Sequence, residues 1–120
     1  MSKMRENAPR VCKNALIDVL GAQFNSITVR VFDEIDSTNT EAKRMALDGF
    51  SGEALLVAHS QTAGRGRMGR SFYSPEQTGA YFSILHTLST PLCDAVAITS
   101  ATSVAVMRAI RTLAGIQTDI

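Results

Sequence analysis

Three glycines alternate with three arginines in one short stretch, Gly64-Arg65-Gly66-Arg67-Met68-Gly69-Arg70. Glycine weakens helices and strands, but it lets a backbone turn sharply and approach a ligand closely. Arginine carries a permanent positive charge on a fork of donors that suits carboxylates and phosphates. The stretch therefore predicts a loop that closes over an anionic ligand, and the surrounding fold must hold such a loop.

Length and charge place this loop in a small globular domain. The chain has 120 residues, of which 45% are hydrophobic, and its formal net charge is +1. These values favour one folding domain over a chain that binds nucleic acid through its overall charge. The positive charge is local instead, since no acidic residue lies between His59 and Glu76.

The chain shows no sign of export or of membrane insertion. Cys12 and Cys93 lie far apart without metal-ligand spacing, which favours two reduced thiols. No run approaches the ~18 apolar residues of a membrane span. The first ten residues lack the apolar core of a signal peptide. A cytoplasmic protein is expected.

Helical and strand-like patterns alternate along the chain. Apolar residues at helical spacing predict helices over residues 11–20, from an N-cap within 37–39 to about 47, and over about 93–113, the last of them long and mostly buried. Runs of β-branched or apolar residues predict strands over residues 27–32, 54–58 and 80–85. Ser37, Thr38 and Asn39 are N-cap candidates for the second helix, and Gly49 closes it.

Several motifs compete for the glycine-arginine stretch. Its glycines have the spacing of the dinucleotide fingerprint, and Gly69-Arg70-Ser71 approaches the end of a phosphate-binding P-loop. Both motifs must open a helix that holds phosphate, whereas Phe72-Tyr73-Ser74-Pro75 follows here. A kinase loop lacks its partner motifs. An arginine-glycine RNA-binding segment would repeat in a disordered chain. On the stretch alone, a solvated basic surface loop stays open.

Three further segments accompany the stretch. Asp36-Ser37-Thr38-Asn39 lies upstream, Gln61-Thr62-Ala63 directly precedes the stretch, and Phe72-Tyr73-Ser74-Pro75 follows it. In this order and spacing, from about Val31 to Ile120, the segments resemble the biotin protein ligases. A lipoate ligase would be expected to show a serine followed by three glycines, which this sequence lacks. The resemblance implies an α+β fold, the biotin/lipoate ligase catalytic domain, whose mixed sheet flanked by helices is similar to class II aminoacyl-tRNA synthetases.

The resemblance implies an ATP-dependent ligase. Such an enzyme activates biotin to biotinyl-5′-AMP and transfers it to a lysine of a biotin carboxyl carrier protein, as in acetyl-CoA carboxylase. Biotin and ATP are then substrates, and Mg²⁺ is expected with ATP, although the chain shows no carboxylate cage for a metal. Residues 1–26, an N-terminal lead and helix, are too short for the winged DNA-binding domain of some members, so neither DNA nor a membrane is expected as a partner.

The resemblance also assigns site residues. Biotin contacts are assigned to the upstream segment, to Gln61 and to the glycine-arginine stretch, namely Ser37, Thr38, Asn39, Gln61, Arg65, Gly66 and Arg67. Hydroxyl and amide groups both donate and accept hydrogen bonds, as the ureido ring of biotin requires. Adenylate and phosphate contacts are assigned to Gly64, Arg67, Gly69 and Arg70. Arg67 has the catalytic role, an electrostatic one on carboxylate and phosphate, and no metal ligand is assigned. The loop is expected to be mobile when empty and to close over the adenylate.

The chain departs from the family at two places. Phe72 stands where a tryptophan is usual. The sequence stops at Thr118-Asp119-Ile120, where members continue with a Lys-Trp-Pro-Asn-Asp strand whose lysine contacts the biotin carboxylate and phosphate. Residues 27–120 are therefore expected to form the N-terminal portion of the catalytic domain, with an unpaired edge that favours association, for instance as a homodimer. A non-catalytic remnant that binds biotin weakly or not at all is the alternative, and a nucleotide- or RNA-binding module is a third.

Overall fold

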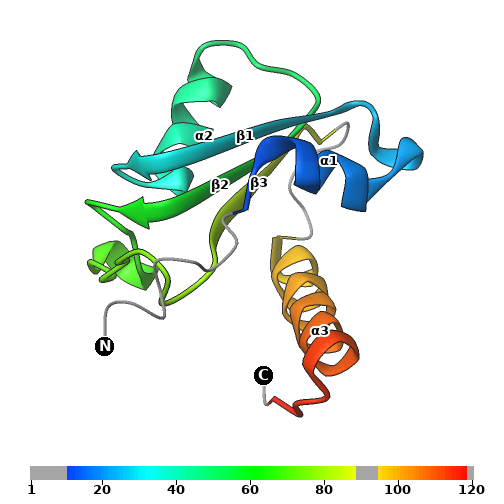
Figure 1. Cartoon of the computed structure of the whole chain (residues 1–120). Coiled ribbons are helices and arrows are strands. Elements are labelled where there is room, and N and C mark those ends of the chain that lie inside the picture. The colour runs from blue at the N-terminus through cyan, green and yellow to red at the C-terminus, as the bar shows by residue number, and fades with distance from the viewer. Residues whose placement is uncertain (1–10, 89–94, 119–120) are drawn as a thin grey trace. The chain divides into compact units, whose positions relative to one another are not determined.

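The computed structural model describes residues 11–88 and 95–118, so the polar lead before residue 11 and the thiol of Cys93 lie outside the described residues. The chain divides into two compact units, Met1–Thr87 and Leu88–Ile120. The first unit contains a sheet with its helices, and the second contains one long helix (Figure 1). Each unit is described by itself.

All helices and strands predicted before residue 88 are present in the first unit. The elements in chain order are α1 (Lys13–Leu20), the 3₁₀ turn η1 (Ala22–Phe24), β1 (Ile27–Ile35), α2 (Thr38–Leu47), β2 (Glu53–Gln61), the 3₁₀ turn η2 (Arg67–Gly69) and β3 (Tyr81–His86). The first two strands extend beyond the predicted ranges at their carboxyl ends. That extension brings both strands close to the motif segments.

The three strands form a mixed sheet, as expected. Their order is β1-β2-β3, with β1 parallel to β2 and β2 antiparallel to β3. The helix α2 makes the crossover that a parallel pair requires. Consequently the carboxyl ends of β1 and β2 and the start of β3 lie at the same end of the sheet, where Ile35 pairs with Gln61 and Ala58 pairs with Tyr81.

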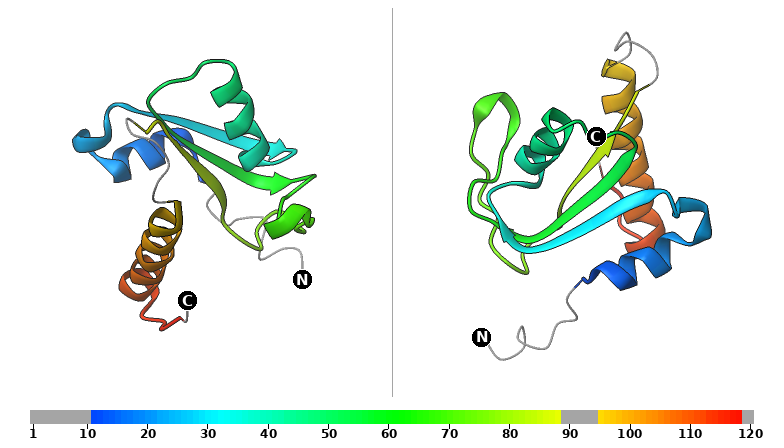
Figure 2. Two further views of the ribbon diagram at one scale, coloured as in Figure 1. Left: turned by 180° about the vertical axis from the view of Figure 1, so that it is seen from behind. Right: turned by 90° about the horizontal axis from the view of Figure 1, so that it is seen from above.

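The core lies between α2 and one face of the sheet. Ala42 and Met45 of α2 are buried against Ala54 and Leu56 of β2. Side chains alternate along a strand, so the residues between them face the other way. The helix α1 lies on that other side, next to β1 (Figure 2, right). Helices therefore flank both faces of the sheet.

The start of α2 forms where the N-cap cluster predicts. Ser37 is the cap residue, in extended conformation, and its hydroxyl accepts a hydrogen bond from the Thr40 amide at 3.4 Å. The helix thus begins at Thr38, within the predicted N-cap cluster. After its end, Gly49 adopts a positive φ of 89° that suits glycine, and the chain turns into β2.

The second unit bears on two expectations. The predicted long helix is present as α3 (Ala95–Ala114), but none of its described side chains is buried within its own unit, so its expected burial stays a prediction. By length and composition alone, residues 96–114 are apolar enough to cross a membrane, so the sequence does approach such a span. Arg108 and Arg111 interrupt this apolar run, but its mean hydropathy is still high enough for a membrane span. A core helix of a soluble domain passes the same test.

Candidate ligand-binding site

A pocket of about 260 Å³ lies at the end of the sheet where the three strands bring the motif segments together. Its walls come from the turn into α2, the end of β2, the glycine-arginine stretch and the start of β3. The lining residues are Ser37, Thr38, Asn39, Gln61, Arg65, Phe72, Ala80, Tyr81, Phe82 and Ser83. The structure thus brings five of the predicted site residues to one cavity.

The hydroxyl residues at the start of α2 form the inner wall. Ser37 and Thr38 are only 1% and 3% exposed, whereas Asn39 is exposed. The Thr38 amide donates to Gln61 Oε1 at 2.8 Å, and the Thr38 and Ser83 hydroxyls share a hydrogen bond of 2.8 Å. Ser37 caps the helix and lines the pocket, so its capping and lining roles coexist.

Gln61 is fixed at both ends of its amide. Its Oε1 accepts from the Thr38 amide, and its Nε2 donates to Ser74 Oγ at 3.1 Å. The Ser74 hydroxyl in turn donates to the Phe72 carbonyl at 3.0 Å. Since a backbone amide can only donate, this network determines which way the Gln61 amide points. One N–H and one oxygen lone pair of Gln61 are left for a ligand.

Gly64 is required by close packing inside the base of the loop. It is buried, and a β-carbon placed on it would lie 2.4 Å from both the Phe72 carbonyl oxygen and Ser74 Oγ. The Phe72 amide also donates to the Gly64 carbonyl at 2.7 Å. Glycine is thus explained here by a protein contact, and its assigned phosphate contact stays a prediction.

Beyond Gly64 the stretch forms a narrow hairpin. Arg65 bridges to Ser71, and the Gly66 amide donates to the Arg70 carbonyl at 2.7 Å. At the tip, Met68 (φ 59°) and Gly69 (φ 75°) adopt successive left-handed conformations that reverse the chain. Residues 70–80, all of them described, contain no helix. The hairpin is therefore neither a dinucleotide fingerprint nor a P-loop, as the sequence predicts.

The hairpin carries the remaining predicted residues outside the pocket. Arg67, Gly69 and Arg70 are exposed and Gly66 is half-buried, and none of the four lines the cavity. Arg65 alone among the hairpin arginines lines it. A ligand held entirely inside the pocket would therefore not contact Arg67 or Arg70 in this arrangement.

Sequence reasoning missed the wall that β3 provides. Tyr81 and Ser83 pair with Ala58 and Leu56, so they point to the α2 side of the sheet. Tyr81 is buried, and its hydroxyl donates to the Pro75 carbonyl at 2.8 Å, which fixes the turn before the strand. The alternation of side chains along residues 80–85 predicts that Tyr81 and Ser83 share one face of the strand. Only the pairing register of β2 and β3 places Ser83 beside Thr38.

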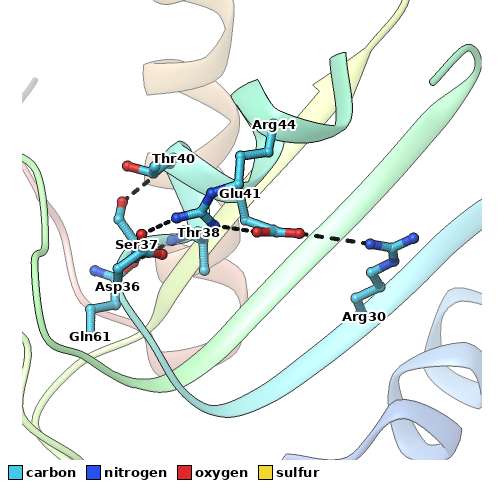
Figure 3. Close-up of polar contacts among 8 residues, drawn as sticks. All are labelled: Arg30, Asp36, Ser37, Thr38, Thr40, Glu41, Arg44 and Gln61. Atoms are coloured by element: carbon cyan, nitrogen blue, oxygen red, sulfur yellow. Dashed lines mark hydrogen bonds and ion pairs between the residues drawn. The ribbon is translucent and has the colours of Figure 1, made fainter. Parts of the chain in front are cut away.

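Charged side chains surround the turn into α2 (Figure 3). The pKa of Asp36 lies below its ordinary value, chiefly because the Ser37 amide donates to this carboxylate and also because Arg44 does. The pKa of Arg44 is raised, first by its bond to Glu41 and then by that to Asp36. Within residues 11–88 and 95–118, no three His, Cys, Asp or Glu side chains gather as a metal site would need.

Comparisons with known proteins agree with the motifs. The sequence model of the biotin/lipoate A/B protein ligase family matches residues 31–120. The bifunctional ligase/repressor BirA of Bacillus spizizenii (strain ATCC 23059 / NRRL B-14472 / W23) is 41% identical over 88 residues, which are 73% of this chain and 27% of that protein. BirA of Bacillus subtilis (strain 168) is 40% identical over the same shares of the two chains. The chain thus spans about a quarter of the length of these curated relatives.

A solved structure extends the likeness to three dimensions. The biotin protein ligase from Aquifex aeolicus, in complex with biotin and ATP, aligns with a TM-score of 0.62 and 29% sequence identity, over 78% of this chain and 38% of that one. The mixed sheet with its helices matches a biotin protein ligase catalytic domain. Because the family match also covers well over half of its length, the chain belongs to the biotin/lipoate A/B protein ligase family.

Proposed function

We propose that this chain carries the biotin-binding part of a biotin protein ligase, an enzyme that forms biotinyl-5′-AMP from biotin and ATP and transfers the biotinyl group to a carrier-protein lysine. One observation carries the proposal: Ser37, Thr38 and Gln61 line one pocket next to Arg65. Hydroxyls and an amide there offer both donors and acceptors to a ureido ring, which has one carbonyl and two N–H groups.

The size of the pocket indicates that it holds only part of the ligand. A cavity of about 260 Å³ is smaller than the ~300–1,000 Å³ of sites that hold drug-sized molecules. It suits the fused rings of biotin rather than a whole biotinyl-adenylate. The carboxylate and the nucleotide would then lie outside the cavity, on the side of the arginine hairpin.

The chemistry needs positioned charge more than a protein nucleophile. A biotin carboxylate oxygen attacks the α-phosphorus of ATP, the bond to the bridging oxygen breaks, and pyrophosphate leaves. Arg67, on the hairpin, is assigned to neutralise the carboxylate and the phosphate, and Arg70 the pyrophosphate. In the second step the carrier lysine attacks the mixed anhydride and AMP leaves.

The same proposal includes the surroundings of the reaction. The acceptor is the biotin carboxyl carrier protein of a biotin-dependent carboxylase, and the reaction takes place in the cytoplasm. Mg²⁺ would enter on the phosphates of ATP, the way in which this ion is usually bound at nucleotide sites.

A labelling experiment tests the proposal. The chain is incubated with biotin and with ATP labelled at the α-phosphate, and biotinyl-adenylate is separated from ATP and AMP. We expect a labelled product that requires biotin and that falls in the Thr38→Val variant, which keeps the shape but removes the hydroxyl. Absence of both product and biotin binding would refute the proposal.

A second candidate function follows from the exposed arginines. Because Arg67 and Arg70 lie outside the pocket, the chain could bind biotin without activating it. Biotin binding without product favours this non-catalytic role.

Affinity for RNA that is independent of biotin and falls steeply with salt would instead indicate a nucleic-acid module.

A further inference from the structure

Arg44 bonds to carboxylates on both sides of the α2 N-terminus (Figure 3). Its guanidinium donates through one nitrogen to Asp36, which precedes the helix, and through the other to Glu41, in the helix. Arg30 of β1 lies 3.8 Å from the second oxygen of Glu41. Arg44 is therefore the residue that joins the turn before the helix to the helix itself.

Asp36 connects this ion pair to the hydroxyl wall of the pocket and to the residue that precedes the hairpin base. One carboxylate oxygen accepts from the Ser37 amide at 2.8 Å, while the other accepts from Arg44. The Asp36 backbone carbonyl accepts from the Ala63 amide at 2.8 Å, directly before Gly64. A displacement of the Asp36 backbone would thus disturb both the hydroxyl wall and the base of the hairpin.

We propose that Arg44 is a positioning residue that acts through Asp36 to hold the Ser37-Thr38 turn and Ala63 in the geometry that binds biotin. This inference rests on the proposed function for its ligand. The side chains of Arg44 and Asp36 are 46% and 37% exposed, so their pairing adds little to global stability. Its effect should appear in ligand affinity and in local backbone motion, not in the melting temperature.

The chain offers a matched control for the charge. Arg44→Ala and Arg30→Ala each remove one arginine that contacts Glu41, but only Arg44 contacts Asp36. We expect Arg44→Ala to weaken biotin binding about two- to fivefold in calorimetry, the range of an exposed ion pair. Arg30→Ala should bind as the unchanged chain does. Arg44→Lys, which keeps the charge but cannot reach both carboxylates in a fork, should recover part of the loss.

A double-mutant cycle tests whether Arg44 acts through Asp36. If it does, Asp36→Asn combined with Arg44→Ala binds biotin no more weakly than the weaker single variant. Two independent losses would multiply instead. A multiplicative result overturns the route through Asp36, as does equal binding by Arg44→Ala and Arg30→Ala.

Amide exchange gives a readout that needs no ligand. In the empty chain, the Ser37 and Ala63 amides should exchange about two- to fivefold faster in Arg44→Ala, and not in Arg30→Ala, if the ion pair holds their acceptors. Failure of the unchanged chain to bind biotin would refute the proposed function, and this exchange result would then decide the role of Arg44 alone. Unchanged exchange at both amides overturns it.

Discussion

Gly64 is the hairpin residue for which the structure predicts the effect of a substitution most sharply. In Gly64→Ala the new β-carbon would lie 2.4 Å from the Phe72 carbonyl oxygen and 2.4 Å from Ser74 Oγ. The first neighbour is backbone and cannot rotate away. The second holds Gln61 by a hydrogen bond, so moving it disturbs the pocket as well. Either the hairpin base separates from residues 72–74 or the Gln61 network breaks.

The cost follows from these two contacts. Overpacking a tight site costs about 1–3 kcal/mol. Loss of the Gln61–Ser74 bond would add about 1 kcal/mol, typical of one hydrogen bond. We therefore expect Gly64→Ala to lower the free energy of unfolding by about 2–4 kcal/mol. In a domain of this size, each kcal/mol shifts the melting temperature by about 4–8 °C.

Gly66 provides the control within the same hairpin. A β-carbon added at Gly66 would have atoms of Arg70 as its nearest neighbours, at 3.4 Å and beyond. The Gly66 φ of −94° suits any residue. Gly66→Ala should thus leave stability unchanged or raise it by about 0.4–1 kcal/mol, because alanine restricts the unfolded chain. Urea unfolding of both variants, followed by circular dichroism, measures the difference. Equal stability of the two variants would show that the close approach at Gly64 is not a feature of the folded protein.

Three further predictions concern the pocket and its charges. Thr38→Val should lower stability by about 1 kcal/mol in urea unfolding, since the Ser83 hydroxyl loses its partner; Ser83→Ala in the Thr38→Val background should cost little more. The pKa of Asp36 is lowered in the folded state, so its contribution is present above the ordinary value of 3.8 and disappears as pH falls through the lower folded value. In acid unfolding, the Asp36→Asn variant should lack this pH-dependent contribution to stability. An unfolding curve identical to that of the unchanged chain contradicts the prediction. Arg67→Ala should slow biotin-dependent pyrophosphate exchange about 10²–10³-fold, the loss typical of removing one preorganised donor that stabilises charge. Arg30→Ala is the control for the lost positive charge. An unchanged rate in Arg67→Ala refutes the assigned role of Arg67.

The elements with local signals were predictable. The N-cap cluster and Gly49 mark the ends of α2, and the continuous apolar run of residues 54–58 marks a buried strand, as the structure confirms. Each of these signals rests on a few neighbouring residues. The loop was predictable for the same reason, because glycine and arginine in alternation suit neither a helix nor a strand.

The features that sequence reasoning missed depend on contacts between distant segments. Ser83 meets Thr38 only through the β2–β3 register, and Arg44 meets Asp36 across the N-cap, between a residue of α2 and one that precedes the helix. The close packing of Gly64 requires the Phe72 carbonyl to return beside it. The burial of α3 likewise depends on what packs on the helix, which an apolar composition does not reveal.

The site consists of two parts with different mechanical properties. The inner wall is buried and held by hydrogen bonds, since Thr38 and Gln61 bond each other and Gln61 also bonds Ser74. The hairpin beyond Gly64 is exposed and reverses at Met68, which is 96% exposed and can gain contacts only by moving. In the proposed function, the preformed wall therefore determines which ring is bound. The hairpin determines whether the bound carboxylate meets its phosphate, so variants of the wall should change biotin affinity and variants of the hairpin arginines should change the rate of adenylate formation.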